Sequence, residues 1–327
     1  MLLANESTSR CWVLSKFCNR SGLGSRSLVE LRRRLRFDVP STLLGFAEAK
    51  WSVVWKFQLR DCTRFAPRDL RQGVINLDHS RALPAAVVSL GFALLARGLR
   101  GVTDGGALAG AVIAFLLMWA AGLEAVLPLV AVFILTLVTT RWRSDRKRNL
   151  GVAERRSGRT ASQVVANLGA AGICAGAAAI FPQRSGILLV GAMAALAEAV
   201  ADTVSSEAGQ AVETQPRMIV GFRPSPTGTN GAISLEGTLA GCIAASIIAW
   251  TATFFGVVSW IAAPVITGAG ICGMLFDSVL GATLENRGKL GNDAVNFVST
   301  VFAADLALVA IVVLESAVRW TPLIDLR

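Results

Sequence analysis

The chain of 327 residues is 53% hydrophobic, carries a net charge of +10 and has a mean hydropathy of +0.56. Its apolar residues are grouped in long blocks, which excludes an ordinary soluble domain and predicts a polytopic transmembrane helix bundle of the all-α class, with about seven to eight crossings. The single histidine and the absence of tyrosine exclude most catalytic arrangements that depend on imidazole. The six cysteines show no CxxC spacing, so we expect neither a disulfide framework nor a zinc site.

Residues 1–80 form a basic segment. Residues 1–81 hold 15 of the 32 basic residues and 7 of the 22 acidic ones, so they carry +8 of the net charge. The segment lacks a clean apolar core followed by a small-residue cleavage site, which argues against a targeting peptide. We therefore expect a poorly ordered N-terminal extension, or an upstream start that is not the natural one. No interleaving of aromatic and basic residues is evident, and we expect no nucleic-acid partner.

From residue 83 onward the sequence predicts membrane crossings. The apolar blocks are 83–99, 105–121, 123–139, 162–181, 186–205, 234–255, 257–284 and 295–314. Crossing a bilayer takes about 20 helical residues, and the first three blocks are short, so one of them could be tilted, re-entrant or merged with its neighbour. We expect eight crossings in a bundle over residues 81–318, followed by a short tail over 319–327. Dense Gly and Ala predict tightly packed helices.

Three polar connections, residues 141–161, 207–233 and 285–294, separate the later crossings. Two crossings lie between each connection and the next, so all three must lie on the same side of the membrane. The first holds eight basic and two acidic residues, which places this side in the cytoplasm, with a bacterial inner membrane as the expected location. The basic segment 1–80 would then lie outside, against the same rule. Either the helix count is off by one or the extension is not a natural topological element.

Several carboxylates and amides fall at the cytoplasmic ends of the predicted crossings. Carboxylates cost roughly 2.5 kcal/mol or more at the bilayer centre, so each is a functional candidate, and a group of oxygen ligands suits Mg²⁺. Glu198 shares a helix face with Asp202, and either a functional or a structural pairing role stays open for it. The predicted metal ligands are Asp202, Glu207 and Asp277, and the predicted catalytic residues are Asp202, Asp277, Asn230, Asn167 and Asn296.

A loop rich in glycine and proline, residues 224–231 (PSPTGTNG), leads into the crossing that starts near Ser234. Backbone N–H groups that open a helix form a natural phosphate site, and nearby arginines can neutralise the charge that develops in phosphoryl transfer. Taken alone, each signal is weak, because loops between helices are commonly rich in Gly and Pro. The predicted nucleotide- and phosphate-binding residues are Gly228, Thr229, Asn230, Gly231, Arg155, Arg156 and Arg159.

Five motifs in order resemble one family. They are 163–167 (QVVAN), 201–207 (ADTVSSE), 226–234 (PTGTNGAIS), 276–283 (FDSVLGAT) and 293–296 (DAVN). These motifs resemble the integral membrane family of domain of unknown function 92, which includes transmembrane protein 19 and phytyl-phosphate kinase, over residues 83–314. The chain departs from the family pattern over residues 157–162 (SGRTAS), where the family commonly has Gly-Arg-Arg-Asn, and at Ala232, where a glycine is common.

The resemblance implies a kinase that transfers a phosphoryl group from a nucleoside triphosphate, with CTP preferred, to an isoprenoid monophosphate such as phytyl phosphate. Its partners would then be the lipid bilayer, the isoprenoid phosphate and the nucleotide, with Mg²⁺ as cofactor. Two alternatives stay open at this point. One is a CTP-dependent lipid cytidylyltransferase, and the other is a transporter or channel, although no inverted repeat with matching broken helices is evident.

Overall fold

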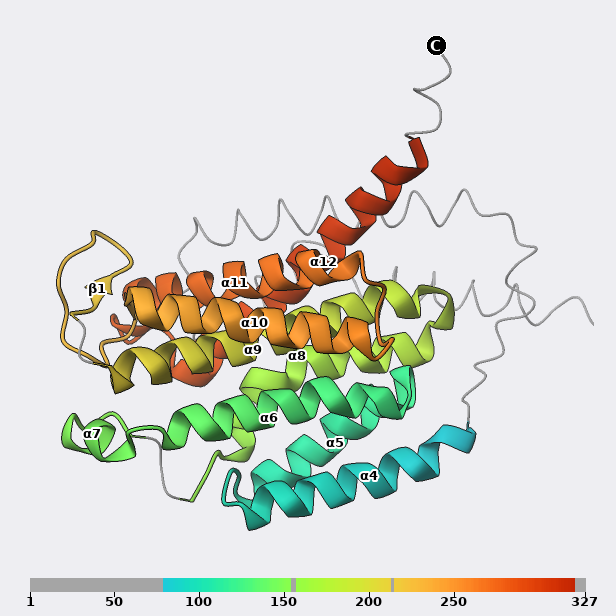
Figure 1. Cartoon of the computed structure of the whole chain (residues 1–327), viewed down its shortest axis with the longest axis horizontal. Coiled ribbons are helices and arrows are strands. Elements are labelled where there is room, and N and C mark those ends of the chain that lie inside the picture. Colours follow the sequence, from blue (N-terminus) through green and yellow to red (C-terminus); the bar gives the residue numbers. More distant parts are fainter. Residues whose placement is uncertain (1–78, 154–156, 213–214, 321–327) are drawn as a thin grey trace, which may run out of the picture. The chain divides into compact units, whose positions relative to one another are not determined.

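The computed structural model describes residues 79–153, 157–212 and 215–320, so almost all of the predicted extension lies outside the described residues. Within them, eight helices are long and apolar enough to cross a membrane, which confirms the predicted all-α polytopic bundle (Figure 1). The eight helices are α4 (His79–Gly98), α5 (Asp104–Ala121), α6 (Val126–Arg141), α8 (Ala161–Ile180), α9 (Ser185–Ala211), α10 (Leu235–Phe254), α11 (Ala262–Leu280) and α12 (Asn292–Trp320).

Short elements connect these helices. They are the 3-10 turns η2 (Leu123–Ala125) and η3 (Pro182–Arg184), the helix α7 (Ser144–Asn149), the antiparallel strands β1 (Arg217–Met218) and β2 (Ala232–Ile233), and the π-helical turn η4 (Gly281–Glu285). The two strands lie in the connection between α9 and α10. The π-helical turn extends α11 at the end where the candidate site is found, a placement that is frequent for π turns at functional sites.

Hydroxyl side chains determine where several spanning helices begin. Thr103 caps α5 by accepting a hydrogen bond from the Gly106 N–H at 3.2 Å, and Ser234 caps α10 in the same way. Thr160 caps α8 in a capping box, in which Oε1 of Gln163 accepts from the Thr160 N–H at 2.8 Å. These caps satisfy N–H groups that the first helical turn leaves without a partner. The polar residues that flank the apolar blocks therefore cap the helices as well as mark where the membrane crossings end.

Helix α9 lies at the centre of the bundle, where it packs against α6, α8, α10, α11 and α12. All of residues 189–201 are buried. Small residues let the neighbouring backbones approach closely, as predicted: a Cβ added to Gly270 of α11 would lie only 2.9 Å from the Cβ of Ala197. The carboxylates that α9 carries are therefore held at the centre of the fold.

Two predicted helix boundaries were wrong. Helix α9 continues to Ala211, six residues beyond the predicted end at residue 205, because its last turns pack against α7 and bury Glu207. Helix α11 begins at Ala262, although the apolar block starts at residue 257. Gly256, at φ +75°, ends the preceding helix in a tight turn. The residues that follow it belong to this connection, although hydropathy alone assigns them to the next crossing.

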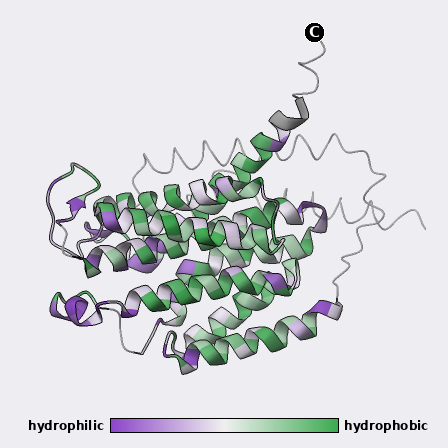
Figure 2. Cartoon of the chain, viewed as in Figure 1, coloured by the Kyte–Doolittle hydropathy of each residue, from purple (hydrophilic) through white to green (hydrophobic). Residues whose placement is uncertain are grey.

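The three polar connections meet at one end of the bundle. Arg143 donates to the carbonyl of Ala211 at 3.2 Å, which joins the first connection to the end of α9. Asn286 donates to the carbonyl of Asn230 at 2.9 Å, which joins the second and third connections. Hydrophilic residues gather at the end that carries α7 and β1, beside predominantly hydrophobic helices (Figure 2). Three spanning helices, α4 to α6, precede the first connection, so among the described residues the helix count is as predicted.

Candidate active site

Two aspartates from different helices face each other near the polar end of the bundle. Asp202 of α9 and Asp277 of α11 are half-buried and interact electrostatically with each other. Asp277 accepts a hydrogen bond from the hydroxyl of Ser299 on α12 at 3.0 Å. Arg159, which precedes α8, interacts electrostatically with Asp202. The predicted pair of carboxylates is thus brought together, with a hydroxyl on one side and a guanidinium on the other.

Two asparagines lie near Ser299, whose hydroxyl contacts both Asp277 and the carbonyl of Asn296. The side-chain amide of Asn167 on α8 donates to the Gln163 carbonyl at 2.8 Å, which orients its oxygen away from its own helix. That oxygen accepts a hydrogen bond from Asn296 of α12 at 3.5 Å. The amides predicted from two distant motifs are therefore neighbours. Ser299, which sequence reasoning missed, lies three residues after Asn296 and hence on the same face of α12, a spacing that is visible in the sequence.

Glu198 lies one helical turn deeper than Asp202 on the same face of α9. Its side chain is 1% exposed, and its Oε1 has no hydrogen-bond partner among the described residues. It interacts electrostatically with both Asp202 and Asp277. Gly273 of α11 provides the space that it occupies, because a Cβ there would lie 2.5 Å from Cγ of Glu198. Glu198 therefore belongs to the acidic cluster and is not ion-paired with a basic residue in the described part of the chain.

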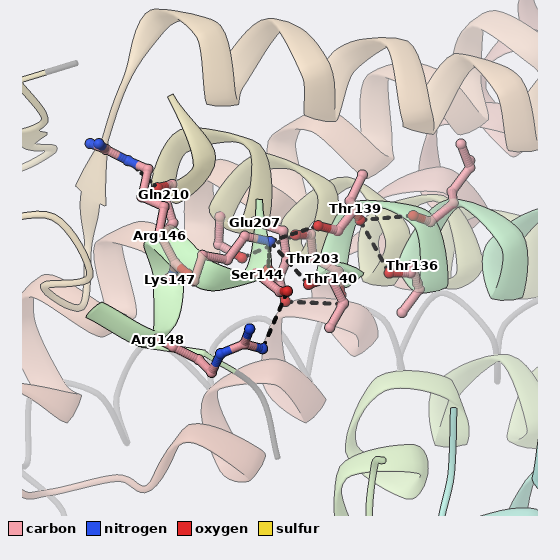
Figure 3. Close-up of polar contacts among 12 residues, drawn as sticks. Thr136, Thr139, Thr140, Ser144, Arg146, Lys147, Arg148, Thr203, Glu207 and Gln210 are labelled. Carbon is pink, nitrogen blue, oxygen red and sulfur yellow. Dashed lines mark hydrogen bonds and ion pairs between the residues drawn. The ribbon is translucent and has the colours of Figure 1, made fainter. Parts of the chain in front are cut away.

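Glu207 does not join this cluster. Its Oε2 forms an ion pair with Nζ of Lys147 at 2.5 Å, and its Oε1 accepts from the Thr140 hydroxyl at 3.0 Å (Figure 3). Lys147, only 1% exposed, also donates to the carbonyl of Thr139 at 2.6 Å. The structure thus assigns Glu207 to a buried contact between α6, α7 and α9. Glu207 follows Asp202 by five positions, which places the two about 140° apart around α9.

The glycine-rich loop packs against the end of α11. Gly231 has φ +76°, and a Cβ there would overlap the backbone N of Ala282 and lie 2.5 Å from the carbonyl oxygen of Ser278. Gly228, at φ +88°, lies as closely against Val152 of the first connection. These two glycines are required by backbone conformation and by close approach. Phosphate binding by the loop stays a prediction.

Other predicted loop residues lie at the same end. The Thr229 hydroxyl donates to the carbonyl of Pro226 at 2.8 Å within the loop, and Asn230 is exposed. Of the three predicted arginines, Arg159 is described, and its Nη2 donates to the Thr203 hydroxyl of α9 at 3.3 Å. Arg155 and Arg156 lie outside the described residues. The loop therefore adjoins the acidic cluster through the π-helical turn at the end of α11, while Arg159 reaches the cluster from the segment that precedes α8.

We expect replacement of Gly231 by alanine to destabilise the protein by about 1–3 kcal/mol, because it combines a strained positive φ with overlap against the end of α11. Gly221→Ala is the matched control, since Gly221 has φ +85° but nothing within 4 Å of an added Cβ. Thermal unfolding in detergent measures both. Equal losses in the two variants would contradict the packing role assigned to Gly231.

The oxygen atoms of the cluster fit Mg²⁺ in type, because carboxylate, amide and hydroxyl oxygens are its preferred protein ligands. Among the described residues, however, no group of three or more His, Cys, Asp and Glu side chains is placed to hold a metal ion. The predicted three-carboxylate set therefore reduces to Asp202 and Asp277. Further ligands would come from water and substrate phosphates, as is usual for Mg²⁺.

A cavity of ≈ 330 Å³ opens beside the cluster, between α4, α5, α6 and α8. Its apolar wall includes Phe92, Leu129 and Phe133, and none of the described residues that line it is acidic. Its polar lining residues include Arg100, Arg141, Arg148, Arg159, Gln163 and Asn167. Arg159 thus adjoins both the cavity and the acidic cluster, and Asn167 lines the cavity while it pairs with Asn296. Sequence reasoning missed the cavity because, apart from the 163–167 motif of α8, its walls come from α4, α5 and α6, which carry none of the five motifs.

A segment before α8 holds Arg159 in place. The backbone N–H of Arg159 donates to the carbonyl of Gly101 at 3.0 Å, and the Thr103 N–H donates to the carbonyl of Arg159 at 2.9 Å. This pairing attaches the segment to the turn between α4 and α5. Gly158, at φ +82°, makes the approach feasible, because a Cβ there would lie 2.7 Å from the carbonyl oxygen of Arg100. Arg100 and Arg159 are therefore positioned together by backbone contacts.

Comparison with known proteins decides the family. A model described as integral membrane protein DUF92 matches residues 87–304, which cover most of the bundle and every motif named above. The chain belongs to the DUF92 family of integral membrane proteins. Its DUF92 region contains the acidic cluster, the loop and the cavity. No solved structure matches the chain significantly.

The DUF92 relatives span several kinds of organism. The chain is 34% identical over 196 residues to the uncharacterized membrane protein sll0875 of Synechocystis, a match that covers 59% of this chain and 76% of the relative. It is 32% identical over 210 residues to the uncharacterized membrane protein MJ0933 of Methanocaldococcus jannaschii, covering 64% and 85%. It is also 32% identical over 231 residues to the chloroplastic protein VTE6 of Arabidopsis thaliana, covering 67% of each chain.

Proposed function

We propose that this DUF92 protein is a membrane kinase that transfers a phosphoryl group from a nucleoside triphosphate, with CTP as donor, to an isoprenoid monophosphate. The similarity to VTE6 and the motifs shared with the phytyl-phosphate kinase family support the reaction class. The observation that carries the proposal is that Arg159 adjoins both the aspartate pair and an amphiphilic cavity, which Asn167 also lines. A lipid phosphate and a nucleotide phosphate can meet at that point.

The chemistry requires positioning more than proton transfer. An oxygen of the acceptor phosphate forms a bond to the γ-phosphorus of the donor, and the bond from that phosphorus to the β,γ-bridging oxygen breaks, giving a prenyl diphosphate and a nucleoside diphosphate. The acceptor phosphate is already a nucleophile, so no general base is needed. Arg159 would neutralise charge on the transferring group, and Asn167 and Asn296 would orient the acceptor phosphate. The loop from Gly228 to Gly231 would bind the donor phosphates.

Asp202 and Asp277 would hold Mg²⁺, which when bound offsets the negative charge of the phosphates. Bringing two half-buried carboxylates together is costly, and this role accounts for the pair better than packing does, since Ser299 supplies only one hydrogen bond to them. With the basic first connection in the cytoplasm, the site would open to cytoplasmic nucleotide. An inner membrane of a bacterium is the location that we propose.

A membrane-fraction assay with Mg²⁺, labelled CTP and a panel of prenyl monophosphates tests the proposal. We expect prenyl diphosphate together with CDP. Release of pyrophosphate would indicate a cytidylyltransferase instead. Uptake of labelled prenyl phosphate into proteoliposomes without nucleotide, combined with no turnover of CTP, would overturn the kinase and favour a transporter. Repeating the assay with labelled ATP in place of labelled CTP identifies the base of the donor nucleotide.

A further inference from the structure

We propose that the cavity between α4, α5, α6 and α8 is the binding site for the acceptor lipid, a single-chain prenyl monophosphate. Its phosphate would lie between Arg100, Arg141 and Arg159, and its tail would extend along α6. The identity of the ligand as a prenyl monophosphate rests on the proposed function. The location of the binding site, and the requirement for an anion with an apolar chain, rest on the cavity itself.

The lining of the cavity changes from basic to apolar along its length. Arg141 lies at the end of α6 where the polar connections meet, and Leu129 lies twelve residues earlier on the same helix, about 18 Å away at 1.5 Å per residue. Phe92 and Phe133 pack edge to face beside that apolar stretch. A ligand that satisfies both ends must be an anion with a long apolar chain.

Among the described residues, four arginines line the basic end of the cavity and no carboxylate does. Arg141 donates to the carbonyl of Leu99, a neutral acceptor, and forms no ion pair with a described carboxylate. Arg148 pairs with Asp145, which does not line the cavity. Arg159 is shared with Asp202. Guanidinium groups bind phosphate through planar forks of N–H donors, so a phosphate here has more than one available partner.

The size of the cavity indicates one chain rather than two. Its ≈ 330 Å³ lies at the lower end of the roughly 300–1,000 Å³ found for small-molecule pockets. Since the walls are helices of the bundle, a second acyl chain would have to displace one of them. A bilayer phospholipid, which carries the same phosphate but two chains, is therefore the ligand that the test must distinguish.

Position 110 controls the length of tail that the cavity admits. Gly110 of α5 lines the cavity, and a Cβ added there meets nothing within 4 Å, so a larger side chain would occupy the cavity without displacing protein. Gly176 of α8 also has nothing within 4 Å of an added Cβ but does not line the cavity. Gly110→Phe and Gly176→Phe thus form a matched pair, because both replace a glycine inside a helix and should change the stability of the fold by a similar amount.

The test measures binding of tritiated phytyl phosphate to the purified full chain in detergent without nucleotide, and kcat/KM for phytyl and geranyl phosphates. We expect Gly110→Phe to weaken phytyl phosphate binding at least tenfold and to shift the kcat/KM ratio toward geranyl phosphate by a similar factor. Gly176→Phe should leave both unchanged. Equal behaviour of the two variants, or equal competition by phosphatidic acid and phytyl phosphate for the site, would overturn the assignment.

A second measurement serves if Gly110→Phe does not fold. A prenyl monophosphate with a photoreactive group at the end of its tail should label peptides of α4, α5 or α6 in the unaltered protein, and labelling confined to α10 and α11 would overturn the site.

The kinase proposal and the cavity proposal can be refuted independently of each other. Specific binding without any turnover of nucleotide refutes the kinase only, whereas turnover with unchanged chain-length preference in Gly110→Phe refutes the cavity only.

Discussion

Asp277→Asn is expected to lower phosphoryl transfer by about 10²- to 10³-fold, the usual cost of removing one group that stabilises transition-state charge. Asparagine preserves the shape of the side chain and an oxygen that can accept the Ser299 hydrogen bond, which is 3.0 Å long in the structure. It removes the negative charge that faces Asp202. The loss should therefore reflect the charge rather than a disturbed fold, and residual activity should require a higher Mg²⁺ concentration.

Asp305→Asn provides the control for that result. Asp305 is also a carboxylate within a spanning helix, α12, but it lies outside the acidic cluster and interacts with neither Asp202 nor Asp277. Activity per mole of membrane-inserted protein should fall in Asp277→Asn and stay near the wild-type value in Asp305→Asn. Normal turnover of Asp277→Asn would remove this residue from the proposed metal site.

Lys147→Met is expected to destabilise the protein by about 3–5 kcal/mol, because it leaves the Glu207 carboxylate buried without its counter-ion. The lysine is 1% exposed, and its Nζ contacts Glu207 at 2.5 Å as well as two carbonyl groups of α6. Methionine fills a similar volume, so the effect should be electrostatic. Thermal unfolding in detergent, followed by loss of monodisperse protein, measures the change.

The double variant Lys147→Met with Glu207→Gln should recover most of the stability lost in Lys147→Met, since no charge is then left buried. Arg148→Met is the comparison at an exposed ion pair with Asp145, where the expected change is within about 1 kcal/mol. If the double variant were no more stable than Lys147→Met, the ion pair would not be the reason for burying the lysine. Retained activity in the double variant would also separate Glu207 from metal binding.

Local patterns were sufficient to predict most of the fold. Hydropathy predicted eight spans, and counting crossings between polar connections predicted that 141–161, 207–233 and 285–294 share one end of the bundle. Both depend only on the order and length of apolar blocks, because each crossing must satisfy its backbone within one helix. Hydropathy did not predict where α9 ends or where α11 begins. Packing against α7 lengthens α9, and the turn at Gly256 delays the start of α11.

The sequence by itself determined that this is a DUF92 membrane bundle and that Asp202, Asp277, Asn167 and Asn296 come from motifs at one end of it. Only the tertiary structure decided which polar groups share a site. Glu207 lies near Asp202 in sequence but on another face of α9, where Lys147 neutralises it, and Ser299 reaches Asp277 from a different helix. The cavity likewise requires four helices, because a space between helices depends on how side chains far apart in the chain pack together, which no local pattern contains.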